Sequence, residues 1–123
     1  MIDTHGDTRT PWIGVDLDGT LAEYHGWKGI DHIGAPIPKM AERLHAWVMS
    51  GKKVKIMTAR VAPGLQDTEQ AKSYIRSWLE EHFNPEVAVI EITHEKDALM
   101  TELWDDRCIQ VIPNTGQRAD GRD

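Results

Sequence analysis

Two aspartates directly follow a short apolar run near the start of the chain. Residues 12–15 are apolar, and Asp16 and Asp18 come next, with Gly19 behind them. In an extended backbone, residues two apart point to the same side, so the two carboxylates lie close together. Neighbouring negative charges raise each other's pKa or require a cation. The pattern therefore predicts a site in which a cation offsets their repulsion.

The apolar runs later in the chain also end at groups that suit phosphate or a divalent metal. These groups are Thr58, Arg60, Lys96, Asp105 and Asp106. Ligands of open α/β sheets bind beyond the carboxyl ends of the strands, so we expect the groups to converge there. Mg²⁺ prefers oxygen ligands. Asp16 offers a carboxylate oxygen, Asp18 its backbone carbonyl, and Asp105 or Asp106 a further carboxylate.

The glycine after the first two carboxylates lets the chain turn sharply. We expect the backbone amides that follow Gly19, from Thr20 onward, to form a concave nest for an anion. The alternative interpretation is an ordinary Asp-Gly turn without chemistry. We favour the anion site because an apolar strand leads directly into the sequence DLDGT.

These groups need a scaffold that brings strand ends together, and the hydrophobic pattern predicts one. Apolar runs predict strands at 12–16, 54–58, 87–92, 102–104 and 108–112. Helical spacing predicts helices over 38–50 and 67–83, the second opened by a capping box of Asp67 and Gln70. Strands that alternate with helices in this way indicate an α/β fold, a doubly wound and mainly parallel sheet with helices on both faces.

Length and composition limit the number of domains and the kinds of partner that the chain can bind. A chain of 123 residues with 40% apolar content predicts a single domain over residues 1–123. We expect residues 1–10 to be a loose leader and residues 114–123 a flexible tail. The net charge of −6 argues against a broad nucleic-acid-binding face.

Location is inferred from what the sequence lacks. No apolar stretch is long enough for a membrane span, and the first residues lack the apolar region of a signal peptide. The single cysteine, Cys108, cannot form an internal disulfide, which suits the reducing cytoplasm. Since Cys108 belongs to an apolar run, we expect it to be inert in a strand.

Several motifs resemble those of one enzyme superfamily. The stretch VDLDGTLA resembles motif I of the haloacid dehalogenase-like (HAD) superfamily, an apolar strand followed by Asp-x-Asp-Gly-Thr. KIMTAR is similar to motif II, Lys96 to motif III, and LWDDR to the Asp-Asp form of motif IV. The motifs occur in the family's order over most of the chain. The resemblance is to a small phosphatase of this superfamily without a cap domain.

The resemblance implies a Mg²⁺-dependent phosphomonoester hydrolase with an aspartyl-phosphate intermediate. Asp16 would be the nucleophile, and Asp18 would protonate the leaving oxygen and later deprotonate water. Thr58 would donate a hydrogen bond to a phosphate oxygen, and Lys96 would neutralise negative charge. Among the metal ligands we favour direct binding by Asp106, with Asp105 bound through water or paired to Lys96.

The loop of residues 21–38 is long enough for a flap and too short for a cap domain. We therefore expect an open site, or one that a second copy of the chain roofs. The expected substrate contacts on the rim are Trp27, Arg60 and Arg107, with Tyr24, His25 and Lys28 beside them. Aromatic and cationic side chains suit a phosphate on something flat or extended, such as a nucleotide or a nucleic-acid end.

Two other functions are compatible with part of the pattern. A signalling receiver domain also forms an aspartyl-phosphate, but its phosphorylated aspartate precedes its threonine and lysine on later strands. Here Thr58 and Lys96 precede the second acidic pair, Asp105 and Asp106, which is the HAD order. A catalytically idle binding module is the other alternative. The sequence does not name the phosphate ester.

Overall fold

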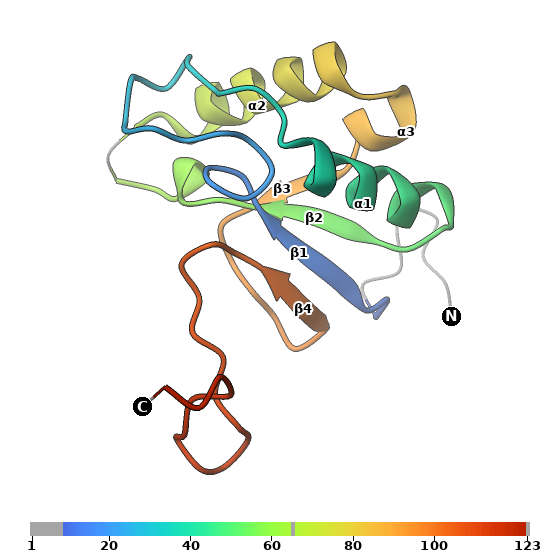
Figure 1. Ribbon diagram of the computed structural model, residues 1–123. Helices are drawn as coiled ribbons and strands as arrows, with labels where there is room; N and C mark the ends of the chain where they lie inside the picture. The colour runs from blue at the N-terminus through green and yellow to red at the C-terminus, as the bar shows by residue number, and fades with distance from the viewer. Residues whose placement is uncertain (1–8, 65, 123) are drawn as a thin grey trace.

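The computed structural model describes residues 9–64 and 66–122, and their backbone forms an α/β fold around one parallel sheet (Figure 1). The sheet has four strands in the order β3-β2-β1-β4, and all its neighbours are parallel. The strands are β1 (Trp12–Asp16), β2 (Val54–Met57), β3 (Glu91–Thr93) and β4 (Met100–Trp104). The helices are α1 (Pro38–Met49), α2 (Thr68–His82) and α3 (Pro85–Ala88), and a 3₁₀ turn, η1 (Ala59–Val61), follows β2. The predicted α/β class and parallel sheet are confirmed.

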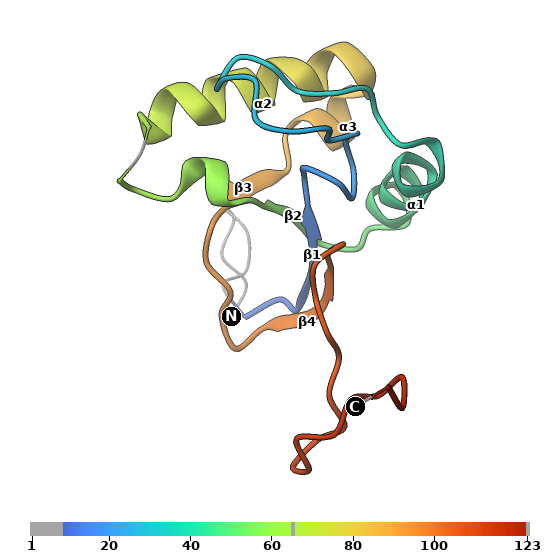
Figure 2. The same ribbon diagram turned by 60° about the vertical axis from the view of Figure 1, so that its left-hand side comes forward.

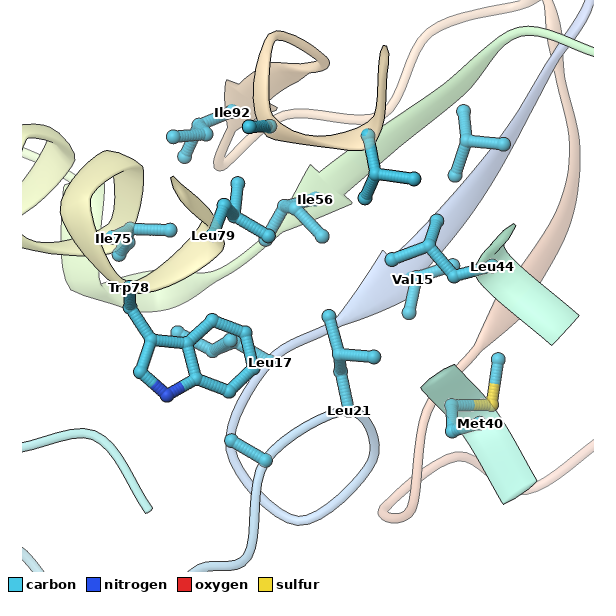
Figure 3. Packing of buried hydrophobic residues seen from close by; sticks show 14 of the residues in the cluster. Val15, Leu17, Leu21, Met40, Leu44, Ile56, Ile75, Trp78, Leu79 and Ile92 are labelled. Atoms are coloured by element: carbon cyan, nitrogen blue, oxygen red, sulfur yellow. The ribbon is translucent and has the colours of Figure 1, made fainter. Parts of the chain in front are cut away.

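The three helices cover the same face of the sheet. Figures 1 and 2 show α1, α2 and α3 on one side of the strands. One core cluster joins them: Val15, Ile56 and Ile92 from the sheet pack with Leu44 of α1 and Leu79 of α2 (Figure 3). Within the described residues, the predicted second helical layer is not found.

The order of the strands explains why the helices share a face. The connections from β1 to β2 and from β2 to β3 step in the same direction along the sheet. Right-handed crossovers in one direction place their helices on one face. The return from β3 to β4 runs through residues 94–99, which contain no helix. In this return loop Asp97 accepts a hydrogen bond from Trp12 Nε1 at 2.8 Å.

Both predicted helices are confirmed, but the third predicted strand is wrong in extent. At the start of α2, Asp67 accepts a hydrogen bond from the Gln70 amide at 3.0 Å, as the capping box predicts. Where a strand was expected from residue 87, Asn84 caps the short helix α3 by accepting from the Val87 amide. Proline at the first helical position favours this start. The strand begins only at Glu91.

The predicted fifth strand, residues 108–112, does not form. Residues 105–107 separate this segment from β4, which is too short for the crossover that a further parallel strand needs. The chain instead leaves the sheet (Figure 1), and Val111 pairs with Arg118 in an antiparallel bridge. Ile109 and Val111 are exposed. Cys108 is exposed as well, so its expected place in a strand is also wrong.

Residues 21–37, which we call the flap, connect β1 to α1 and close on themselves at the base. Ala22 forms a bridge with Pro36, and the Ile37 amide donates to the Leu21 carbonyl at 2.7 Å. Trp78 of α2 donates its indole N–H to the Gly34 carbonyl at 2.9 Å. The flap therefore lies against α2, as Figures 1 and 2 both show.

None of the helices in the described part of the chain has the length and apolar character needed to cross a membrane. Residues 1–8, most of the expected leader, lie outside the described residues.

Candidate active site

Three carboxylates meet where two neighbouring strands end. Val15 lies opposite Trp104 in the pairing of β1 with β4, so the carboxyl ends of these strands are side by side. Asp16 ends β1, and Asp105 and Asp106 follow β4 directly. One carboxylate oxygen from each of the three lies within 4.8 Å of the others. We call these three residues the acidic cluster.

The turn after β1 fixes the position of Asp106. The Thr20 hydroxyl accepts a hydrogen bond from the Asp106 amide at 3.0 Å. The same hydroxyl lies 3.3 Å from Asp16 Oδ2 and 3.2 Å from Asp106 Oδ1, so it can donate to either carboxylate. Gly19 has φ +88°, and a Cβ there would lie 2.5 Å from Asp106 Oδ2. The turn is thus packed directly against the acid, with no room for a side chain.

The predicted anion nest in this turn does not form. The amides of Thr20, Leu21 and Ala22 all donate to the carbonyl of Leu17, and the Gly19 amide donates to the carbonyl of Ala22. Hydrogen bonds within the turn therefore use the amides that were expected to face an anion. Thr20 acts in the site through its hydroxyl.

Asp16 is the carboxylate whose charge is opposed most strongly. Partial burial raises its pKa from 3.8 to about 7, helped by the charge of Asp105, a hydrogen bond with Asp106 and the charges of Asp106 and Asp18. The neighbouring charges that act most on Asp16 are all negative. A hard cation relieves such repulsion, and carboxylate oxygens are the ligands it prefers. The acidic cluster could therefore hold a divalent cation such as Mg²⁺.

Asp18 does not belong to the acidic cluster, and its carboxylate binds Arg60. Arg60 Nε donates to Asp18 Oδ2 at 2.8 Å, and Arg60 Nη2 donates to Asp18 Oδ1 at 2.9 Å. Arg60 is only 5% exposed. It was expected on the rim as a substrate contact, and the structure shows its side chain buried, with the guanidinium bound to Asp18 and to two flap carbonyls.

One cavity of about 700 Å³ connects most of the predicted site residues. Its lining includes Asp16, Asp18, Tyr24, Trp27, Thr58, Arg60, Gln66, His94, Asp105, Asp106 and Arg107. The Thr58 hydroxyl, at the end of β2, accepts a hydrogen bond from the Arg60 amide at 3.1 Å, so its own hydrogen remains to donate. The volume lies within the range of small-molecule sites.

The lining of the cavity leaves out Gly19, Thr20 and Lys96 among the predicted site residues, and it includes two residues that sequence reasoning missed. Lys96 is exposed in the return loop and does not line the cavity. His94 lines the cavity, although it belongs to none of the motifs. It directly follows β3, so the strand-end rule points to it once that strand is placed at Glu91–Thr93. Gln66 also lines the cavity, and no motif marks it.

Comparison with known proteins identifies no relative of this chain. No family model, curated protein or solved structure matches the chain. The motif resemblance therefore stays a hypothesis, and the chemistry of the site must be argued from its own geometry.

Proposed function

We propose that this protein is a Mg²⁺-dependent phosphomonoester hydrolase that forms an aspartyl-phosphate on Asp16. The convergence of the acidic cluster at two adjacent strand ends carries the proposal. The threonine expected at the next strand end, Thr58, and the second motif I acid, Asp18, line the same cavity. The HAD-like order of these groups along the chain supports the same chemistry.

In the first half of the reaction, an oxygen of Asp16 attacks the phosphorus in line with the leaving group. The bond between phosphorus and the ester oxygen breaks, and Asp18 gives its proton to that oxygen. The Thr58 hydroxyl donates to a non-bridging phosphate oxygen and holds the group in the attacking geometry.

In the second half, a water molecule attacks the phosphorus of the aspartyl-phosphate. Asp18, now ionised, takes a proton from this water. The bond between phosphorus and Asp16 breaks, which releases inorganic phosphate and regenerates the Asp16 carboxylate. The two acids therefore have the separate tasks that the motif resemblance implies, and Asp18 must exchange a hydrogen bond with Arg60 for a proton before it acts as the acid.

Positive charge is needed because both the nucleophile and the phosphate are anionic. A divalent cation held by the acidic cluster supplies this charge and favours the ionised form of Asp16. Lys96, to which the resemblance assigns part of this task, lies outside the cavity. Arg107 lines the cavity, and we assign it the contact with the phosphate group.

A catalytically idle binding module is the second candidate. The place of Lys96 outside the cavity and the engagement of Asp18 by Arg60 are the observations that favour it. Such a module would bind a divalent cation or a phosphorylated ligand without turnover. Activity measurements separate the two functions.

The test is hydrolysis of p-nitrophenyl phosphate by the wild-type chain and by Asp16→Asn. We expect wild-type activity that a chelator abolishes and that Mg²⁺, but not Ca²⁺, restores, since Ca²⁺ takes looser, higher coordination. Asp16→Asn should be inactive, while Asp120→Asn, a paired carboxylate of the tail, should match the wild type. Full activity in excess chelator, or Mg²⁺ binding without any hydrolysis, would contradict the proposal.

A further inference from the structure

Arg60 is a buried centre of hydrogen bonds beside the site. Its guanidinium donates to both carboxylate oxygens of Asp18, at 2.8 and 2.9 Å. It also donates to two flap carbonyls, His32 O at 2.8 Å and Ile30 O at 3.3 Å. The ring of Trp27, again from the flap, lies 4.8 Å from the guanidinium carbon. One side chain therefore contacts the acid and the middle of the flap together.

The same nitrogen atom joins the two sides. Arg60 Nη2 donates one hydrogen to Asp18 Oδ1 and the other to His32 O. The guanidinium is planar and rigid, so its hydrogen bonds have fixed relative directions. A displacement of the His32 carbonyl must therefore rotate the guanidinium, and with it the plane of the bound carboxylate.

Arg60 binds the middle of the flap, where Ile30 and Ile33 also pack against the core cluster. The base of the flap is fixed by the bridge between Ala22 and Pro36 and by the indole of Trp78 on Gly34. The carbonyls that Arg60 binds lie between these attachments in the chain. A second pocket of about 180 Å³ also has Asp18 and Arg60 in its lining. The ion pair thus borders both cavities.

We propose that Arg60 is a positioning residue that couples the flap to Asp18, so that a substrate which contacts Trp27 sets the direction of the acid–base carboxylate. The catalytic half of this inference rests on the proposed phosphatase function. The structural half, the coupling itself, does not. Arg60 acts through Asp18 and does not read the substrate directly.

The coupling is tested without any activity, by hydrogen exchange of flap peptides covering residues 24–33. Asp18→Ala removes the carboxylate that holds Arg60, so we expect faster exchange in this part of the flap. Asp16→Ala is the matched control, because Asp16 lies two residues before Asp18, and the carboxylate that Arg60 binds belongs to Asp18. Equal flap exchange in the two variants would overturn the coupling.

The catalytic half is tested by the dependence on the leaving group. Alkyl phosphates need protonation of the leaving oxygen more than aryl phosphates do, so Asp18→Asn should lose ~10²-fold or more on an alkyl ester and less on p-nitrophenyl phosphate. Arg60→Gln should show the same difference in kcat, and the double variant should lose no more than Asp18→Asn alone. Arg60→Lys keeps the charge without the bidentate geometry and repeats the test where Arg60→Gln does not fold.

The control is Arg76→Gln, which removes an arginine that donates to two backbone carbonyls, those of Ala88 and Ile90, away from the site. Its ratio of alkyl to aryl turnover should equal that of the wild type. Equal losses on both esters in Arg60→Gln, or a change in KM alone, would overturn the positioning role. A wild-type chain without phosphatase activity would refute the proposed function, while the exchange experiment would still decide the coupling.

Discussion

At the scale of single residues, the charge of Asp16 is the feature that most needs an explanation. Its pKa of about 7 lies well above the ordinary value of 3.8. Between about pH 4 and 7, the folded state therefore binds more protons at this position than the unfolded state does. In the metal-free protein, the contribution of Asp16 to the free energy of unfolding therefore falls as the pH rises through this window.

Asp16→Asn should remove this loss. We expect the variant to be more stable than the wild type in the presence of a chelator, by a margin that grows from pH 4 to pH 7. Urea unfolding at several pH values measures it. Asp97→Asn is the control of opposite sign, because the hydrogen bond from Trp12 lowers the pKa of Asp97 and its contribution is lost as the pH falls. A margin for Asp16→Asn that does not change with pH would contradict the account.

Gly19 is needed for two reasons, its positive φ and the close approach of the Asp106 carboxylate, and an experiment can separate them. Both Gly19 and Gly51 have a positive φ, +88° and +87°, but only at Gly19 would a Cβ meet the carboxylate of Asp106. Gly19→Ala and Gly51→Ala should each lose about 1–2 kcal/mol of unfolding free energy from backbone strain. Only Gly19→Ala should also lose Mg²⁺-dependent activity, because Asp106 must move. Full activity in Gly19→Ala would show that the position of Asp106 is unimportant.

The residues at strand ends were predictable from sequence because the rule concerns backbone position. Asp16, Asp105 and Asp106 meet as expected, and this follows once β1 and β4 are neighbours. The direction of a long side chain could not be predicted in the same way, because it depends on segments that are distant in the sequence. Arg60 follows β2 as predicted, but its burial depends on the path of the flap, which no local pattern specifies.

At the scale of elements, the predictions were confirmed where the hydrophobic pattern and the capping residue indicated the same element. The capping aspartate of α2 and the apolar face behind it gave the correct helix. The segment from residue 87 failed because buried Val87 and Ala88 fit a short helix as well as a strand, and the preceding Asn84 and Pro85 decide between them. The composition of residues 108–112 suits a strand, but the connection from β4 through residues 105–107 is too short to return the chain to the sheet as a parallel strand.

Because residues 108–112 do not join the sheet, we expect the segment that begins at residue 109 to contribute little to the free energy of unfolding. Among the described residues beyond 108, none belongs to the core cluster, and Ile109 and Val111 are exposed. Deletion of residues 109–123 should change the unfolding free energy by less than about 1 kcal/mol and leave the proposed phosphatase activity intact. Denaturant unfolding of the shortened chain measures this. A loss of several kcal/mol would mean that the segment packs on the sheet after all.

At the scale of the whole molecule, the strand order explains both the site and the uneven covering of the sheet. Because the chain steps from β1 to β3 in one direction and returns to β4 in a single short loop, the helices gather on one face. The same return places β4 next to β1 and so completes the acidic cluster. It also holds Lys96 in an exposed loop, which its position in the sequence did not reveal.

The most direct test of the central claim is to trap the covalent intermediate. The Asp18→Asn variant, with Mg²⁺ and an aryl phosphate, should accumulate an aspartyl-phosphate because its hydrolysis lacks the base. Acid quenching, reduction with borohydride and peptide mass spectrometry then convert the acyl phosphate to homoserine and locate it. We predict homoserine in place of Asp16 and nowhere else. Homoserine in place of Asp105 or Asp106, or none while the wild-type chain turns over the same ester, would contradict the account.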